Sequence, residues 1–378
     1  MALLLPAFVL IVVIVFFLSI HNRYSTKQDD DKRPGRDGKD VNKSEKGEPA
    51  TIDLSAVKPV ATSFNWQIAS PVPYRPWHNG PYHVTMGIKN TAIENWIEVD
   101  DTYLEKLTLK RELFEKHGDV TTQTLPGCEE AAFEGLHLLA DYLPRRYPSM
   151  FRQSGENTIE NMVTKETWDL ARNASTWQRY HPLEVMGLLA SEDFFLLQTD
   201  SQTGVSSLKA GAVCFPAGWK IQDRIGHSLW QIHAGKVPQY ESKLAKSMDR
   251  FFVRMRVGSA ITRFNYAIDD SNELFHPHSH HNLSAEKKVR LEDLHLRVER
   301  QFLQRLPKTR ALLFSIRTYI TPITEVTKDK EVAAALRNSV ASYTDDVAKY
   351  KNKPLWNSVL ADHLEEVLND CRLEKVRI

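Results

Sequence analysis

Polar residues recur at every second position along three segments that are otherwise apolar. The segments cover residues 259–268, 294–300 and 311–320. Because side chains alternate across a β-strand, each segment read as a strand shows one polar pair on one face. The pairs are Arg263 with Asn265, Arg297 with Glu299, and Arg317 with Tyr319. If the three strands are neighbours, we expect the pairs to converge on one concave surface.

Guanidinium groups inside core-like sequence need a counter-charge, because an unpaired buried charge is strongly destabilising. Glu299 can neutralise one arginine. The excess positive charge favours an anionic ligand: a phosphate, a carboxylate or the propionates of a haem. The alternative is an edge position, with one strand face in water and the arginines solvated. Arg305 and Arg310 adjoin Pro307 and Lys308, so we predict them to be surface residues of a turn.

One histidine stands out by its neighbours. His233 ends the apolar run LWQIH and precedes Ala234 and Gly235, which are small enough to let a flat ligand approach closely. A hydrogen-bonded core histidine is the alternative. The tract HPHSHHN, residues 276–282, fits no closed zinc spacing, and its polar neighbours favour an exposed loop. No nucleophile elbow, phosphate-binding loop or dinucleotide-binding glycine pattern occurs in the sequence.

The elements that must position these residues follow from hydrophobic periodicity. Helices are predicted over residues 129–142, 181–191, 236–257, 329–350 and 355–373. Strands are predicted over residues 194–199, 210–215, 259–268, 294–300 and 311–320. The strands cluster in the second half, with helices before and after them. This order predicts an α+β fold with an antiparallel sheet and flanking helices.

The N-terminus predicts a membrane anchor. Residues 2–20 carry no charge and would form a helix of roughly 28 Å, close to the thickness of the hydrocarbon layer. A cleaved signal peptide is the alternative, but the basic residues follow the apolar run instead of preceding it. That asymmetry predicts a cytosolic position for the rest of the chain. Residues 21–63 are polar and charge-mixed, which is typical of a disordered tether.

Overall composition excludes several classes of protein. The formal net charge is +1, so nothing global indicates binding to nucleic acid. The three cysteines are far apart and odd in number, so neither a disulfide framework nor a cysteine metal site is predicted. A reducing compartment fits this usage best.

Six blocks of sequence carry a family resemblance. They lie at Pro81–Phe114 (beginning PYHVTMGIK), Leu139–Pro148 (LADYLPRRYP), His181–Leu197, Ala212–Tyr240 (containing GHSLWQIHAGKVPQY), Thr262–Ile268 (TRFNYAI) and Leu294–Ile323. In this order and spacing the chain resembles the haem-dependent oxidative N-demethylases, including their membrane-tethered fungal relatives.

The resemblance implies a PAS-like antiparallel sheet that encloses haem b. It implies His233 as the axial ligand, with His295 as the second choice. On this view Arg263, Asn265, Arg300 and Arg317 bind the cofactor, and Glu299, Arg297 and Tyr319 form the catalytic group. The haem would oxidise an N-methyl group of a small amine with dioxygen and release formaldehyde. The sequence has no visible flavin or iron–sulfur motif, so a separate flavin- and NAD(P)H-dependent reductase is implied.

These expectations define four parts of the chain. They are an anchor over residues 1–20, a tether over 21–63, a haem-dependent N-demethylase-like domain over 64–324 and a C-terminal helical extension over 325–378. A single-pass protein of an endomembrane such as the endoplasmic reticulum is expected. Two alternatives stay open: a glycosyltransferase of the secretory pathway, and a PAS-like haem or ligand sensor without turnover.

Overall fold

The computed structural model describes residues 51–278 and 288–370, all of which belong to one unit, Ser44–Ile378. The predicted anchor and most of the predicted tether lie outside the described residues, as does the HPHSHHN tract beyond His278. Within the described ranges, no helix combines the length and the hydropathy needed to cross a bilayer.

The described residues form a large antiparallel sheet and a small one. The large sheet has seven strands in the order β1-β8-β9-β10-β6-β7-β2. Its strands are β1 (Lys89–Thr91), β2 (Thr122–Thr124), β6 (Asp193–Thr199), β7 (Ser206–Ala212), β8 (Ala260–Asp269), β9 (His295–Arg305) and β10 (Leu312–Pro322). The small sheet consists of β3 (Phe151–Gly155), β4 (Thr158–Asn161) and β5 (Glu166–Asp169). The predicted α+β class with an antiparallel sheet is confirmed.

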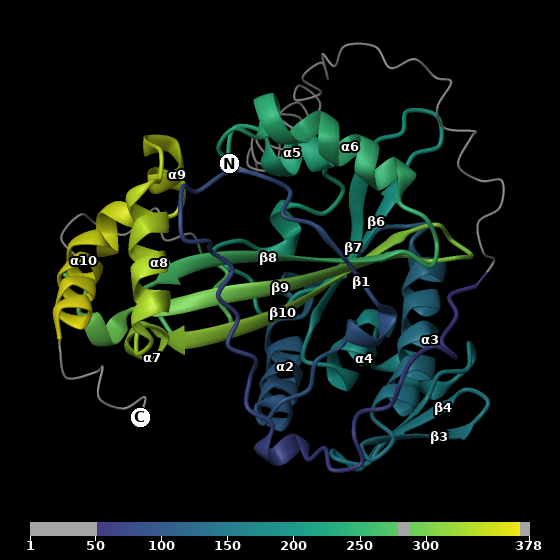
Figure 1. The fold of residues 1–378 in the computed structure, drawn as a ribbon. Coiled ribbons are helices and arrows are strands. Elements are labelled where there is room, and N and C mark those ends of the chain that lie inside the picture. Colours follow the sequence, from purple (N-terminus) through teal and green to yellow (C-terminus); the bar gives the residue numbers. More distant parts are fainter. Residues whose placement is uncertain (1–50, 279–287, 371–378) are drawn as a thin grey trace, which may run out of the picture. The chain divides into compact units, whose positions relative to one another are not determined.

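Helices lie on both faces of the large sheet (Figure 1). They are α2 (Tyr103–His117), α3 (Glu129–Arg146), α4 (Pro182–Leu189), α5 (Leu229–His233), α6 (Ala245–Arg254), α7 (Ile323–Val326), α8 (Lys330–Ala341), α9 (Asp345–Tyr350) and α10 (Lys353–Asn369). A π-helical turn, Tyr240–Leu244, leads directly into α6. The predicted helix over 236–257 therefore starts later than expected, after Gly235 at φ 69° and Pro238.

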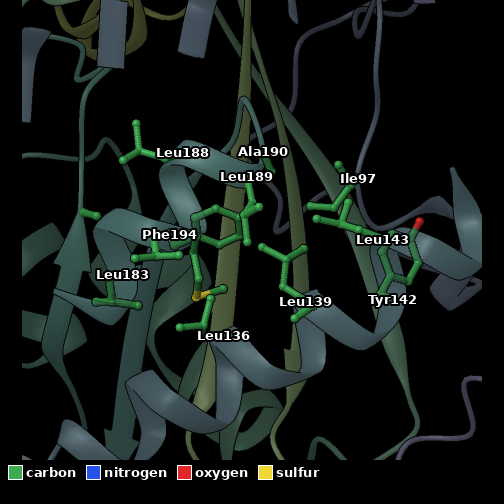
Figure 2. Close-up of a cluster of buried hydrophobic side chains, with 14 of the residues drawn as sticks. Ile97, Leu136, Leu139, Tyr142, Leu143, Leu183, Leu188, Leu189, Ala190 and Phe194 are labelled. Carbon is green, nitrogen blue, oxygen red and sulfur yellow. The ribbon is translucent and has the colours of Figure 1, made fainter. Parts of the chain in front are cut away.

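The main core lies between the sheet and helices α3 and α4. Figure 2 shows Leu136, Leu139 and Leu143 of α3 pointing towards Leu189 of α4 and Phe194 of β6. All five side chains are fully buried. The spacing of three and four residues along α3 places its leucines on one side of the helix, so burial of this apolar stripe attaches α3 to the sheet.

The opposite face of the sheet is covered by α5 and α6 (Figure 1). Leu229 of α5 and Phe252 of α6 pack there against Ile261 of β8 and Leu303 of β9. We call this side, on which Ile261 and Leu303 lie opposite each other, the α5 face.

The register of the central strands decides which polar side chains meet. Glu299 of β9 lies directly opposite Asn265 of β8, so both side chains point to the α5 face. Arg317 of β10 lies opposite Arg300 of β9, and Tyr319 shares their side, which is the side of α2. The strands β8, β9 and β10 are neighbours, so the condition for convergence of the polar pairs is met. The prediction that all three polar pairs converge is wrong, because the pairs divide between the two faces.

The C-terminal helices complete a second apolar core at the far end of β8, β9 and β10. Leu336 of α8 and Leu360 of α10 pack in the same cluster as Tyr266 and Tyr319 of the sheet. After α9 the chain reaches the edge of β8, where the Lys351 ammonium donates a 2.5 Å hydrogen bond to the carbonyl of Tyr266. The boundary between residues 324 and 325 stays a prediction.

Candidate functional site

Local sequence places His233 at the end of the short helix α5. Ser228 begins the helix through a capping box, in which its hydroxyl accepts from Gln231 N and its own N–H donates to the Gln231 side chain. Gly235, at φ 69°, follows the last helical turn, and such a conformation is easily adopted only by glycine. Leu229 is buried against the sheet, so α5 is held down at its first residue and presents His233 at its last.

The two ring nitrogens of His233 have different surroundings. Nδ1 lies 2.7 Å from the carbonyl oxygen of Leu229, which can only accept, so Nδ1 carries the proton. Nε2 makes no hydrogen bond within the described part of the chain. The imidazole is stacked on the buried ring of Tyr240, with 5.1 Å between centroids and 18° between planes. Tautomer and ring plane are thus both set.

Burial keeps the His233 imidazole neutral. It lowers the pKa of His233 to about 4, and the positive charges of Arg224, Arg263 and Lys236 lower it in the same direction. At neutral pH the Nε2 lone pair is therefore free. A neutral histidine whose other nitrogen donates to a carbonyl is the usual arrangement of a metal-ligating histidine. Among residues 51–278 and 288–370 no cluster of three or more His, Cys, Asp or Glu is placed to hold a metal ion.

A connected polar row lies on the α5 face of β8 and β9. Arg263 Nη1 donates to Gln301 Oε1 at 2.9 Å, and Gln301 Nε2 donates to Glu299 Oε2 at 2.9 Å. Asn265 Nδ2 donates to the same carboxylate oxygen at 3.3 Å. The sequence predicted Arg263, Asn265 and Glu299 on one surface, and the structure brings them together. Gln301 was missed, although it follows Glu299 at the period of two.

Two atoms of this polar row could still form hydrogen bonds with a ligand. Glu299 Oε1 accepts no hydrogen bond from a described residue, and the buried Nε of Arg263 has no partner there either. Arg263 and Glu299 are attracted electrostatically, but neither forms an ion pair within the described ranges. An acceptor from a ligand would satisfy Arg263, and a donor or cation would satisfy Glu299.

Apolar side chains adjoin the polar row. Phe314 and Ile316 of β10 point to the same face and pack in one cluster with Ile232 of α5 and Trp219. All four are only partly buried, although the two β10 residues lie in the middle of the sheet. The surface near His233 therefore offers apolar contact beside isolated polar groups, as pockets for flat organic ligands do.

The sequence did not identify Arg224 and Tyr350 as members of this region. The Arg224 guanidinium lies over the Trp219 ring, 4.2 Å from its centroid, and has no ion-pair partner in the described part. Arg224 occurs in a turn without periodicity, so only its position in the same block as His233 pointed to it. Tyr350 is 41% exposed and interacts electrostatically with Arg263 and Glu299. Nothing in the sequence indicates that a residue so far along the chain lies here.

Arg297 is on the α5 face but is occupied by the protein itself. Its Nη2 donates to the carbonyls of Phe215, at 2.8 Å, Pro216 and Leu274, and its Nη1 donates to that of Glu273. The side chain is buried, with 2% of its surface exposed. Arg297 joins two loops to β9. The geometry shows a structural role for Arg297, and the catalytic role that the resemblance implied stays a prediction.

The acids that neutralise Arg300 and Arg317 come from a distant segment. On the side of the sheet facing away from α5, Arg300 Nε lies 2.9 Å from Glu98 and Arg317 Nη2 lies 2.7 Å from Asp100. Tyr319 donates a hydrogen bond to Glu98. Burial alone would lower the pKa of Arg317, but Asp100 and Glu192 raise it above its ordinary value. Arg300, Arg317 and Tyr319 are thus separated from His233 by the sheet, which corrects their expected grouping with it.

One other expectation is wrong, at the end of β9. Arg305 was predicted to lie at the surface, but it is buried, and its guanidinium donates to the carbonyls of Met255, Arg310 and Phe252. A cavity of about 580 Å³ lies beside it, lined mainly by the β6–β7 hairpin and the β9–β10 turn, and His233 is not among its lining residues.

His295, the second candidate for an axial ligand, lies at the start of β9, where its Nδ1 is 2.9 Å from Asp293 O.

The residues of this region lie within a segment that matches a known protein family. The family described as haem-dependent oxidative N-demethylase, alpha subunit-like, matches residues 87–361 of the 378. The chain belongs to this family. The match spans all of β6 to β10, α5, α6, α8 and α9. His233, the polar row, Arg224 and Tyr350 all lie inside the region of the haem-dependent oxidative N-demethylase match, which extends beyond the last block of resemblance seen in the sequence.

Proposed function

We propose that the chain binds haem b between α5 and the α5 face of the sheet, with His233 Nε2 as the protein ligand to iron, and that it removes N-methyl groups oxidatively from a small amine. The observation that carries the proposal is His233 itself: a neutral imidazole with Nδ1–H bound to Leu229 O and Nε2 free. When bound, haem supplies the activation of dioxygen and the oxidation of the methyl group, which leaves as formaldehyde. Family membership supports this chemistry.

The residues of the α5 face fit the two kinds of surface that haem presents. Arg263 and Arg224 are cations without ion-pair partners in the described chain, and each suits a propionate. Phe314, Ile316 and Ile232 suit the apolar macrocycle. The sheet with helices across one face is also compatible with the PAS-like architecture implied by the resemblance, and we retain that assignment as part of the proposal.

Glu299 is the group proposed to receive the amine. Its Oε2 is held by Asn265 and Gln301, so its Oε1 is the atom available to accept from a protonated amine. A carboxylate at this position attracts the ammonium form and orients it by a charge-assisted hydrogen bond. Asn265 acts by fixing the carboxylate plane.

The proposed chemistry also requires a source of electrons for the chain and a location in the cell. The family description names an alpha subunit, which suits a chain that receives electrons from another protein. We propose a separate flavin- and NAD(P)H-dependent reductase as their source. The apolar N-terminal segment is proposed as a single-pass anchor, with the remainder of the chain on the cytosolic side of an endomembrane.

A visible spectrum tests haem binding. The chain from about Thr62 onward, purified with haem, is expected to show a Soret band. His233→Ala should lose or shift this band, while His295→Ala should keep it. An unchanged band in the His233 variant would remove His233 as the ligand. A wild-type protein that stays colourless after reconstitution would remove the haem proposal.

Turnover separates an enzyme from a sensor. With a reductant present, mono-, di- and trimethylated amines are expected to support oxygen consumption together with formaldehyde release. Glu299→Gln should keep the Soret band but raise KM at least tenfold, because one charge-assisted hydrogen bond contributes about 1.5–3 kcal/mol. An amine that shifts the spectrum without any formaldehyde would favour the sensor.

A further inference from the structure

A row of cations occupies the outer side of the layer that holds His233. Lys243, Lys246 and Arg250 are exposed and spaced three and four residues apart, so they lie on one side of the π-helical turn and α6. Lys236 is exposed in the preceding turn, where its N–H donates to His233 O at 3.1 Å. We call these four residues the basic surface.

Acidic residues of the same elements balance the basic surface only in part: Glu241 lies in the π-helical turn and Asp249 in α6. None of its four side chains forms an ion pair within the described ranges. Several exposed arginines elsewhere do have carboxylate partners, as in Arg152–Glu160 and Arg179–Glu115. Residues 236–254 contain five lysines and arginines against two acids, whereas the formal net charge of the whole chain is only +1, so this segment carries a local excess of positive charge. Such a field attracts an acidic partner and accelerates its association.

The position of the basic surface links it to the candidate iron ligand. The inner side of the same elements carries Tyr240 and Leu244, which pack in one cluster with Trp230 of α5. Tyr240 stacks directly on His233. Figure 1 shows α5 and α6 together over one side of the sheet. A protein bound to the basic surface is therefore separated from His233 by about one helix diameter, roughly 10 Å.

We infer that the basic surface, Lys236, Lys243, Lys246 and Arg250, is the docking site for an acidic electron-donor protein. The inference rests on the proposed haem function, which requires reducing equivalents that the chain does not generate itself. It adds the place of docking and the charge of the partner. An anionic membrane surface would be attracted by the same charges, and the experiment distinguishes the two.

The test uses the solubilised full chain, with and without haem. The probes are two acidic donors, a plant-type ferredoxin and a flavodoxin, and vesicles containing phosphatidylserine. Variant one combines Lys243→Glu, Lys246→Glu and Arg250→Glu. The control combines Lys58→Glu, Lys116→Glu and Lys165→Glu, which are exposed elsewhere and change the net charge equally. Circular dichroism verifies that both variants fold.

Variant one is expected to bind at least one donor about tenfold or more weakly than wild type, with a smaller dependence on salt, while the control binds normally. Reduction of the loaded protein by that donor should slow in parallel. The inference would be overturned if both variants bind the donors equally weakly, or if neither donor binds the wild type. It would also be overturned if variant one loses only the binding of vesicles. Donor binding is also measured without haem, so a failure of haem binding is recorded separately.

Discussion

The imidazole of His233 lies almost parallel to the phenol ring of Tyr240, with an angle of 18° and a centroid separation of 5.1 Å. Only six residues separate the two in the sequence, so the plane of the candidate ligand is set by its own segment of the chain. A hydrogen bond from Nδ1 to Leu229 fixes the tautomer, and the stack fixes the rotation about the side-chain axis.

Replacing Tyr240 by leucine should weaken haem binding about 10- to 100-fold, which is the usual effect of losing a group that orients a metal ligand. Titration of the apoprotein with haem, followed at the Soret maximum, measures the change. Tyr240→Phe retains the ring and is the matched control. If both variants weaken haem binding equally, the hydroxyl of Tyr240 is the group that matters and the stacking is not.

Arg263 and Arg297 should respond oppositely to the same substitution. Arg263→Met is expected to weaken haem binding with little change in the free energy of unfolding, because among the described residues the guanidinium has one acceptor and its Nε has none. Arg297→Met should lower the free energy of unfolding by about 2–4 kcal/mol, because four carbonyls lose their donor. Urea unfolding and haem titration of both variants give the comparison, and a reversed pattern would assign the ligand to Arg297.

Removing one partner of the buried ion pair between Arg317 and Asp100 should be strongly destabilising. Asp100→Asn removes the ion-pair partner of the buried Arg317 guanidinium, so we expect a loss of about 3–5 kcal/mol in urea unfolding. Arg152→Met, which removes an exposed ion pair with Glu160, should cost less than about 1 kcal/mol. A loss of haem binding by folded Asp100→Asn would show that the two sheet faces are coupled.

Acid should destabilise the apoprotein partly through His233. The folded pKa is lowered to about 4 from an ordinary 6.5, so below about pH 6.5 the unfolded state binds a proton that the folded state excludes. Stability from this residue is complete above pH 6.5 and is lost progressively down to about pH 4, by up to about 3 kcal/mol. His233→Gln should flatten this part of the stability profile.

The exposed His78→Gln variant serves as the control for the pH profile. His181, whose pKa is also lowered to about 4 by burial, leaves a residual slope in the His233 variant. A profile unchanged by His233→Gln would mean that the imidazole is accessible to protons in the folded protein.

The sequence alone determined which side chains of a strand lie on the same face. Arg297 and Glu299 share a side, as do Arg317 and Tyr319, because side chains along a strand alternate with a period of two. The same alternation, together with helical periodicity, was enough to predict the class of fold and the strands β6 to β10. Strands β1 to β5 and helices α2 and α5 were not predicted, and the single helix expected over residues 329–350 is divided into α8 and α9. Six blocks in one order and spacing, among them the block around His233, suggested the family.

Only the tertiary structure decided how the strands align and what reaches them from elsewhere. A shift of one residue in register moves every side chain of a strand to the other face, and the alternation within one strand cannot specify its partner's register. For this reason Arg317 and Tyr319 were wrongly grouped with Arg263. Glu98 and Asp100 pair with arginines some 200 residues later, and Tyr350 comes from beyond the predicted haem domain. Such contacts depend on packing of whole elements, and local sequence carries no signal for them.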